Sequence, residues 1–192
     1  MKTASLFFIL AAVSSYGQGT IVYDQQSSIE GNNGEGAYDI QSNQPMGQSF
    51  TPAFSSVGFI RLRLLDGNFG GGGASVYVNL REDSIAGNIL ASSLQVSMPD
   101  GFTGFADFFF STPVTVNAAT TYFFQPVIQS GDPWSVAGHN AFGYGGGTAF
   151  LNGQPLPAVD LWFREGIVVP EPGTWILLLI GCGLLTWRRR LL

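Results

Sequence analysis

Short runs in which apolar and polar residues alternate dominate the middle of this 192-residue chain. Between Ile60 and Leu64, leucine and isoleucine alternate with arginine, and between Val76 and Arg81 apolar side chains alternate with tyrosine and asparagine. A period of two residues is typical of a strand with one buried face and one wet face. No stretch shows a convincing helical period. The pattern therefore predicts antiparallel strands.

Further strands are expected between clusters of Gly, Asn, Asp and Pro. They are predicted at Thr20 to Tyr23, Gln48 to Thr51, Leu94 to Met98, Gly104 to Phe110, Thr121 to Gln129 and Val159 to Arg164. Eight or nine short strands without a repeat favour an all-β fold, a single antiparallel β-sandwich with jelly-roll-like connections. The core is expected to be rich in phenylalanine: Phe102, Phe105, Phe108, Phe109, Phe110, Phe123 and Phe124.

The N-terminus has the three parts of a secretory signal. Lys2 gives a positive start, Leu6 to Val13 is an apolar segment, and Ser15-Tyr16-Gly17 offers small residues for cleavage before Gln18. The apolar segment shows no alternation, which disfavours a first strand. We expect residues 1–17 to be a signal peptide and the chain to be exported.

The C-terminus carries a second targeting segment. Pro170-Glu171-Pro172-Gly173 precedes an apolar run from Thr174 to Trp187, which is followed by Arg188, Arg189 and Arg190. As a helix, this run would span about 21 Å, against roughly 30 Å of membrane hydrocarbon. It is predicted to be a short transmembrane helix, and the arginines would hold its end on the cytoplasmic side.

This order of Pro-Glu-Pro, hydrophobic helix and arginine cluster resembles the PEP-CTERM sorting signal of exported proteins in Gram-negative bacteria. The resemblance assigns Pro170, Glu171, Pro172 and Arg188 to Arg190 to the signal and implies a partner, the membrane enzyme exosortase, with removal of the helix near Pro-Glu-Pro. A short tail anchor after a proline-rich linker is the alternative. Four segments of the mature region also resemble, diffusely, uncharacterised β-sandwich domains of PEP-CTERM proteins: Gly47 to Thr51, Val57 to Asp66, Val76 to Arg81 and Asp160 to Arg164. That likeness implies a fold and no activity.

Residues 18–169 are strongly acidic. They contain four arginines, twelve acids and no lysine, which gives a net charge of −8. A nucleic-acid partner is therefore not expected, because phosphate binding needs clustered Lys and Arg. The one cysteine, Cys182, lies in the apolar tail, so this region has neither a disulfide nor a thiol nucleophile.

Candidate catalytic groups are few. His139 is the only histidine, and the chain has no Gly-x-Ser-x-Gly motif, so neither a serine hydrolase nor a zinc site is expected. An acid pair that hydrolyses glycosidic bonds stays open as a minor alternative. Its candidates are Asp66, Glu82, Asp83, Asp100, Asp107, Asp132, Asp160 and Glu165.

No cofactor is predicted. Structural calcium is an alternative at Asp66-Gly67-Asn68 and Glu82-Asp83-Ser84, although turns use the same residues for their backbone.

Aromatic residues beside glycine-rich loops suggest a glycan-binding alternative. Trp134, Tyr144 and Trp162 are the candidates, because exposed rings can stack on the apolar face of a sugar. Ordinary packing under loops is the competing interpretation. The sequence thus predicts a non-enzymatic structural or adhesive protein of the cell surface or polysaccharide matrix, held in the membrane before processing, with polysaccharide as a further candidate partner.

Overall fold

The computed structural model of the chain describes residues 19–32, 36–68 and 70–170. Residues Ile21–Val168 form one compact unit, and a second unit consists of Met1–Thr20 and Val169–Leu192. The predicted signal peptide, the C-terminal helix and the sorting residues beyond Pro170 lie outside the described residues. Within the described ranges, no helix has the length and hydropathy needed to cross a membrane.

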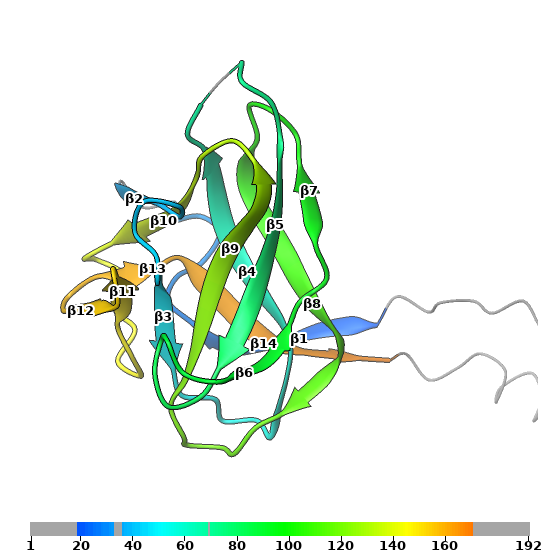
Figure 1. Ribbon diagram of the computed structural model, residues 1–192. Helices are drawn as coiled ribbons and strands as arrows, with labels where there is room; N and C mark the ends of the chain where they lie inside the picture. The colour runs from blue at the N-terminus through cyan, green and yellow to red at the C-terminus, as the bar shows by residue number, and fades with distance from the viewer. Residues whose placement is uncertain (1–18, 33–35, 69, 171–192) are drawn as a thin grey trace, which may run out of the picture. The chain divides into compact units, whose positions relative to one another are not determined.

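The compact unit is built from two antiparallel sheets packed face to face (Figure 1). The first sheet contains β1 (Thr20–Gln26), β2 (Gly36–Asp39), β4 (Ser56–Asp66), β8 (Thr103–Thr115), β10 (Trp134–His139), β13 (Asp160–Leu161) and β14 (Phe163–Val169). The second contains β3 (Gly47–Phe50), β5 (Ala74–Arg81), β6 (Ile89–Ser92), β7 (Val96–Met98), β9 (Tyr122–Gly131), β11 (Ala149–Leu151) and β12 (Gln154–Leu156).

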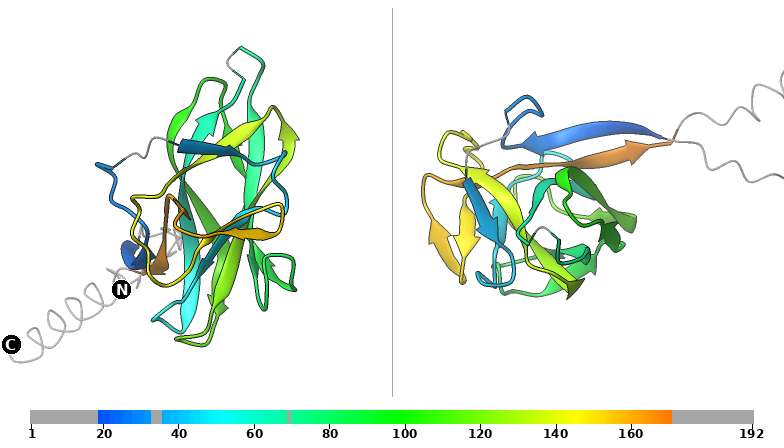
Figure 2. Two further views of the ribbon diagram at one scale, coloured as in Figure 1. Left: turned by 90° about the vertical axis from the view of Figure 1, so that its left-hand side faces the viewer. Right: turned by 90° about the horizontal axis from the view of Figure 1, so that it is seen from above.

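Strand β4 organises the first sheet. Strand β8 pairs with it from Ser56 to Leu65, while β14 and β10 pair with successive parts of β4. Beyond β14 lies β1, so the first and last strands of the unit are neighbours and run side by side (Figure 2). The interior position of β14 means that the first sheet is incomplete until the chain has been made almost to the sorting signal.

The alternating residues of β4 and β5 fill the core as the sequence predicts. Ile60, Leu62 and Leu64 from β4 and Val76 and Val78 from β5 are wholly buried in one cluster between the sheets. Phenylalanine contributes much of the remaining volume. Phe50, Phe108, Phe124 and Phe163 are each 0% exposed members of this cluster. Burial of such side chains contributes about 1.5–3 kcal/mol each relative to leaving them exposed.

The predicted all-β antiparallel sandwich is confirmed, and the jelly-roll connectivity stays a prediction. The described residues contain fourteen strands, more than the eight or nine expected. The additional ones are short or rich in glycine and polar residues, and they pair at the margins of the sheets: β2, β6, β11 and β12 are examples. The segment expected as one strand from Val159 to Arg164 is broken at Trp162, where β13 ends and β14 begins after it.

Candidate functional site

Two of the three aromatic residues expected to bind a glycan are inaccessible. Trp134 and Trp162 are both 0% exposed, so the prediction that their rings offer a sugar-stacking surface is wrong. Trp134 was expected in a loop but lies on β10 and packs against Phe102, with ring centroids 6.1 Å apart. Its burial fits the competing interpretation of ordinary packing.

Trp162 is buried for a different reason. It lies at the break between β13 and β14, packs against Phe105 with centroids 4.4 Å apart, and is covered by residues 27–32, which we call the strap. The indole Nε1 donates to the backbone carbonyl of Asn32 at 3.0 Å. Trp162 therefore holds the strap against the outer face of the first sheet.

Tyr144, the third candidate, is half-buried and occupied by contacts within the domain. Its hydroxyl accepts a hydrogen bond from Thr51 N at 3.0 Å, and its ring packs edge-on against Phe163. Burial raises the pKa of the phenol. The structure does not bring Tyr144 together with the two tryptophans as one exposed surface, because Trp134 and Trp162 belong to separate buried clusters.

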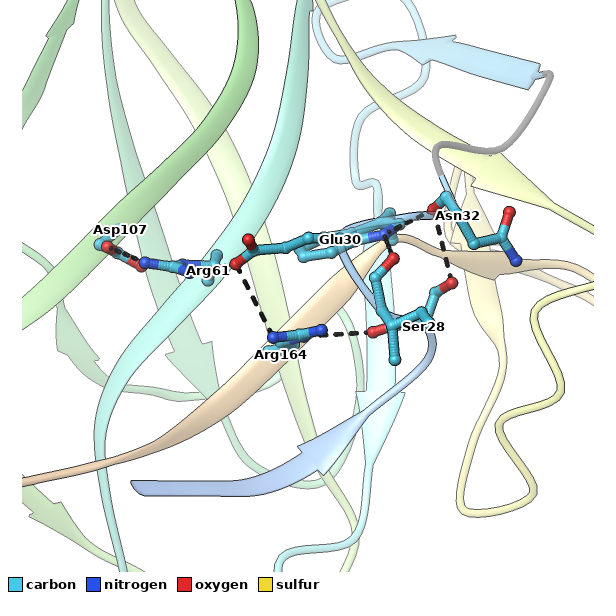
Figure 3. A network of polar contacts seen from close by, with 8 residues as sticks. Ser28, Glu30, Asn32, Arg61, Asp107 and Arg164 are labelled. Atoms are coloured by element: carbon cyan, nitrogen blue, oxygen red, sulfur yellow. Dashed lines mark hydrogen bonds and ion pairs between the residues drawn. The ribbon is translucent and has the colours of Figure 1, made fainter. Parts of the chain in front are cut away.

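A polar network lies on the outer face of the first sheet (Figure 3). Arg61 on β4 is the Cα partner of Arg164 on β14 and of Asp107 on β8. Its guanidinium makes a two-pronged contact with Asp107, with Nε donating to Oδ1 at 2.6 Å and the second nitrogen donating to Oδ2 at 2.8 Å. These hydrogen bonds raise the pKa of Arg61.

Glu30 on the strap connects the two arginines. Its Oε1 lies 2.5 Å from Arg61 and 3.7 Å from Arg164. The Nε of Arg164 donates to the backbone carbonyl of Ser28 on the same strap at 3.2 Å. We call Arg61, Arg164, Glu30 and Asp107 the arginine cluster. Its two carboxylates offset the repulsion between arginines placed directly opposite one another in the sheet.

Aromatic rings line the arginine cluster. The Arg164 guanidinium lies 4.8 Å from the ring centroid of Tyr23 and 5.5 Å from that of Trp162, and Arg61 lies 5.8 Å from Tyr23. Tyr23 continues a row of ring contacts through Phe59 to Phe109. Cation–π contacts of this kind contribute about 0.5–2 kcal/mol each, depending on how far water is excluded.

A second unusual group is the carboxyl of Glu165, the residue after Arg164. It is 0% exposed, and neither oxygen has a hydrogen-bond partner among the described residues. Burial, reinforced by the neighbouring Asp24, raises the pKa of Glu165 to about 9. The group is therefore a neutral acid at neutral pH. Asp24 itself caps a turn, accepting from Ala53 N at 2.7 Å and Phe54 N at 2.8 Å.

Among the remaining predicted acids, the side chains of Asp66 and Asp100 lie close enough to interact. Asp66 accepts from the backbone N–H groups of Asn68 and Gly101, both at 2.7 Å, and these bonds lower its pKa. Asp83 has a left-handed backbone at φ 66°, as a turn requires. Within the described ranges, no three or more His, Cys, Asp or Glu residues come close enough to share a metal ion. The turn role proposed for Asp66 is observed directly, and calcium stays an untested alternative.

His139 also serves a turn. Its Nδ1 accepts from Ala141 N at 2.9 Å, and its ring packs beside Phe142. Of the predicted sorting residues, the structure describes only Pro170, which follows directly on β14 and is exposed.

Sequence reasoning did not find the arginine cluster. Alternation with leucine places Arg61 on an outer face, but it cannot show that Arg164, which is distant in sequence, pairs directly with it. Glu30 belongs to no expected strand, so nothing in the pattern pointed to it. The sequence alone gave only a weak signal, since all four arginines in residues 18–169 fall on predicted strands and nothing in the pattern separates Arg61 and Arg164 from the others.

Comparison with known protein families gave one match. Residues 168–190 match the model described as the PEP-CTERM protein-sorting motif. The match begins in the last two residues of β14 and covers the Pro-Glu-Pro, the apolar run and the arginines. It confirms the resemblance inferred from the sequence. No curated protein matches the chain.

Proposed function

We propose that this chain, a PEP-CTERM protein that is exported and sorted through exosortase, serves as a non-enzymatic structural or adhesive component of the cell surface or extracellular matrix. The observation that carries the proposal is the position of the sorting motif. It begins within β14, so the sorting signal follows the β-sandwich in the chain without a linker. The β-sandwich is therefore the domain that the sorting signal directs to the cell surface.

The described part of the domain supports a structural role. The sandwich is packed around large apolar side chains, and the polar groups described above mostly serve turns and cross-strand contacts. The acid with the most strongly raised pKa, Glu165, is wholly buried, where a polymeric substrate cannot touch it. Asp107, another candidate acid, is engaged by Arg61. These contacts favour a scaffold over a hydrolase.

Localisation tests the proposal. Cells expressing the full chain would be separated into inner membrane, periplasm, outer surface and released material, and the sandwich would be detected with an antibody. We expect the processed domain on the surface of intact cells or in the released matrix. A processed domain confined to the periplasm would contradict the proposal.

Assays for sugar hydrolysis address the alternative activity. We expect purified protein to release no reducing sugar from the polysaccharide of the same cells. Release that is lost in Asp160→Asn or Glu165→Gln, while the variant keeps its fold, would replace the structural role by catalysis through an acid pair.

A further inference from the structure

We propose that the arginine cluster is a binding site for a carboxylated polysaccharide, with the Glu30 carboxylate occupying the site until a carboxylate of the polymer replaces it. The proposal rests on the matrix role above and names the ligand class of that role. It is carried by four features of the outer face of the first sheet.

The first feature is the placement of positive charge. Residues 18–169 carry a net charge of −8, yet three of their four arginines lie on two adjacent strands, Arg61 and Arg63 on β4 and Arg164 on β14. Arg61 and Arg63 alternate with the buried Leu62 and Leu64, which places them on the outer face. A polyanion repelled by the rest of the domain would meet attraction on this face.

The second feature is the way the two opposed arginines are neutralised. One oxygen of Glu30 faces both guanidinium groups, at 2.5 Å and 3.7 Å. The Glu30 side chain is 47% exposed, whereas the side chains of Arg61 and Arg164 are 18% and 11% exposed. The carboxylate thus covers the arginines from the solvent side, where an incoming carboxylate would approach. Two guanidinium groups suit a carboxylate because each presents several fixed donors.

The third feature explains how exchange can occur without unfolding the strap. Ser27 at one end is bound to β14 through Phe163 N at 2.9 Å, and Trp162 Nε1 binds the carbonyl of Asn32 at the other end. Neither contact involves the Glu30 side chain. Rotation of that side chain into water would therefore open the arginines while the strap stays in place.

The fourth feature favours a sugar chain over an acidic peptide. Tyr23 lies beside both arginines and begins the ring row that ends at Phe109, which is 36% exposed. A uronic acid offers a carboxylate next to an apolar ring face, which matches a cation next to an aromatic ring. A peptide that added to β14 or β4 as a further strand would find no free edge there, because β14 lies between β1 and β4, and β4 is bordered by β8.

Binding of polygalacturonate to the full-length chain in mild detergent tests the site, with dextran as the neutral polymer. We expect wild-type protein to bind polygalacturonate, to release it as salt is raised, and to ignore dextran. Arg164→Gln should weaken binding at least tenfold, because a charge-assisted contact is lost. Arg81→Gln is the matched control, since Arg81 lies on β5 in the second sheet and its loss should leave affinity within twofold.

Glu30→Gln is a second variant that tests the same site even if Arg164→Gln fails to fold. We expect this variant to bind polygalacturonate severalfold more tightly, because the competing internal charge is gone. Equal weakening by Arg81→Gln and Arg164→Gln, weaker binding by Glu30→Gln, or no binding by wild type would overturn the proposal. Binding of poly-L-glutamate as tight as that of polygalacturonate would also overturn it, in favour of an acidic protein partner. Surface localisation without binding would reject the ligand site alone, whereas failure to reach the surface would reject the proposed function.

Discussion

Ser27 and Phe163 tie the first and last strands of the sandwich together. Ser27 N donates to the carbonyl of Phe163 at 3.0 Å, and Phe163 N donates to the hydroxyl of Ser27 at 2.9 Å. The same hydroxyl donates to the carbonyl of Leu161 at 2.7 Å. The contact spans the break between β13 and β14, so one side chain satisfies backbone groups that the interrupted strand would otherwise leave unpaired.

Ser27→Ala should therefore lower the free energy of unfolding by about 1–3 kcal/mol, because Phe163 N and the carbonyl of Leu161 lose their buried partner. Urea unfolding followed by tryptophan fluorescence measures the change. Ser28→Ala is the control; among the described residues the Ser28 hydroxyl makes a single hydrogen bond, to the carbonyl of Asn32 at 3.5 Å, and the effect of the substitution should stay within about 0.5 kcal/mol. Equal effects of the two substitutions would contradict the role given to Ser27.

Leu62→Ala should lower the free energy of unfolding by about 2–5 kcal/mol, because it leaves a cavity between the sheets. The same urea titration measures this loss. Leu94→Ala provides the comparison, since Leu94 is 58% exposed and should tolerate the change almost without cost. A Leu62→Ala protein as stable as wild type would mean that the core does not lie between β4 and β5.

The alternation of apolar and polar residues was enough to predict the main strands. It did not predict which side chains are buried by contacts with neighbouring strands and loops. Leu62 and Val78 could be placed in the core because a period of two fixes their face. Asn79, by the same rule, was assigned to a wet face, but it is 4% exposed and bonds with Gln125 on β9 and Ser92 on β6. In a sandwich, loops can bury the outer face of a strand as well. The local sequence pattern does not indicate such burial.

The aromatic residues show the same limit. Trp162 stands between Asp160 and Arg164 in a polar alternation that predicts exposure. The strand breaks there, and the strap closes over the ring. The arginine cluster depends on four segments distant in sequence, those of Glu30, Arg61, Asp107 and Arg164, so only the folded chain reveals it.

Glu165 should make the domain less stable as pH rises. Its ordinary pKa of 4.5 is raised to about 9 in the folded protein, so between these values the folded state keeps a proton that the unfolded state releases. Its stabilising contribution is complete below pH 4.5 and is lost as pH rises toward 9, at roughly 1 kcal/mol per pH unit. Unfolding in urea at pH 5 and pH 8 measures the slope.

Glu165→Gln removes this ionisation and should flatten the slope, leaving the variant more stable than wild type at pH 8. Asp83→Asn is the control, because Asp83 is exposed and Asn accepts the same left-handed backbone. A slope unchanged by Glu165→Gln would show that Glu165 is not the buried neutral acid described here.

Two changes in the sorting motif should block processing for different reasons. Glu171→Ala should leave precursor in the inner membrane through lost recognition by exosortase, and deletion of Arg188 to Arg190 should do so through lost topology. Immunoblots of membrane fractions report the precursor. Arg81→Gln, outside the motif, should be processed like wild type; normal processing of both motif variants would count against recognition of these residues.

The intact mass of protein released from the cell surface tests the central claim most directly, that the chain is sorted and cut at its C-terminal motif. We predict a mature species that lacks Trp175 to Leu192 and ends close to Pro170-Glu171-Pro172. A surface species that retains Arg188 to Leu192 would show that the tail is a permanent anchor and would contradict the account.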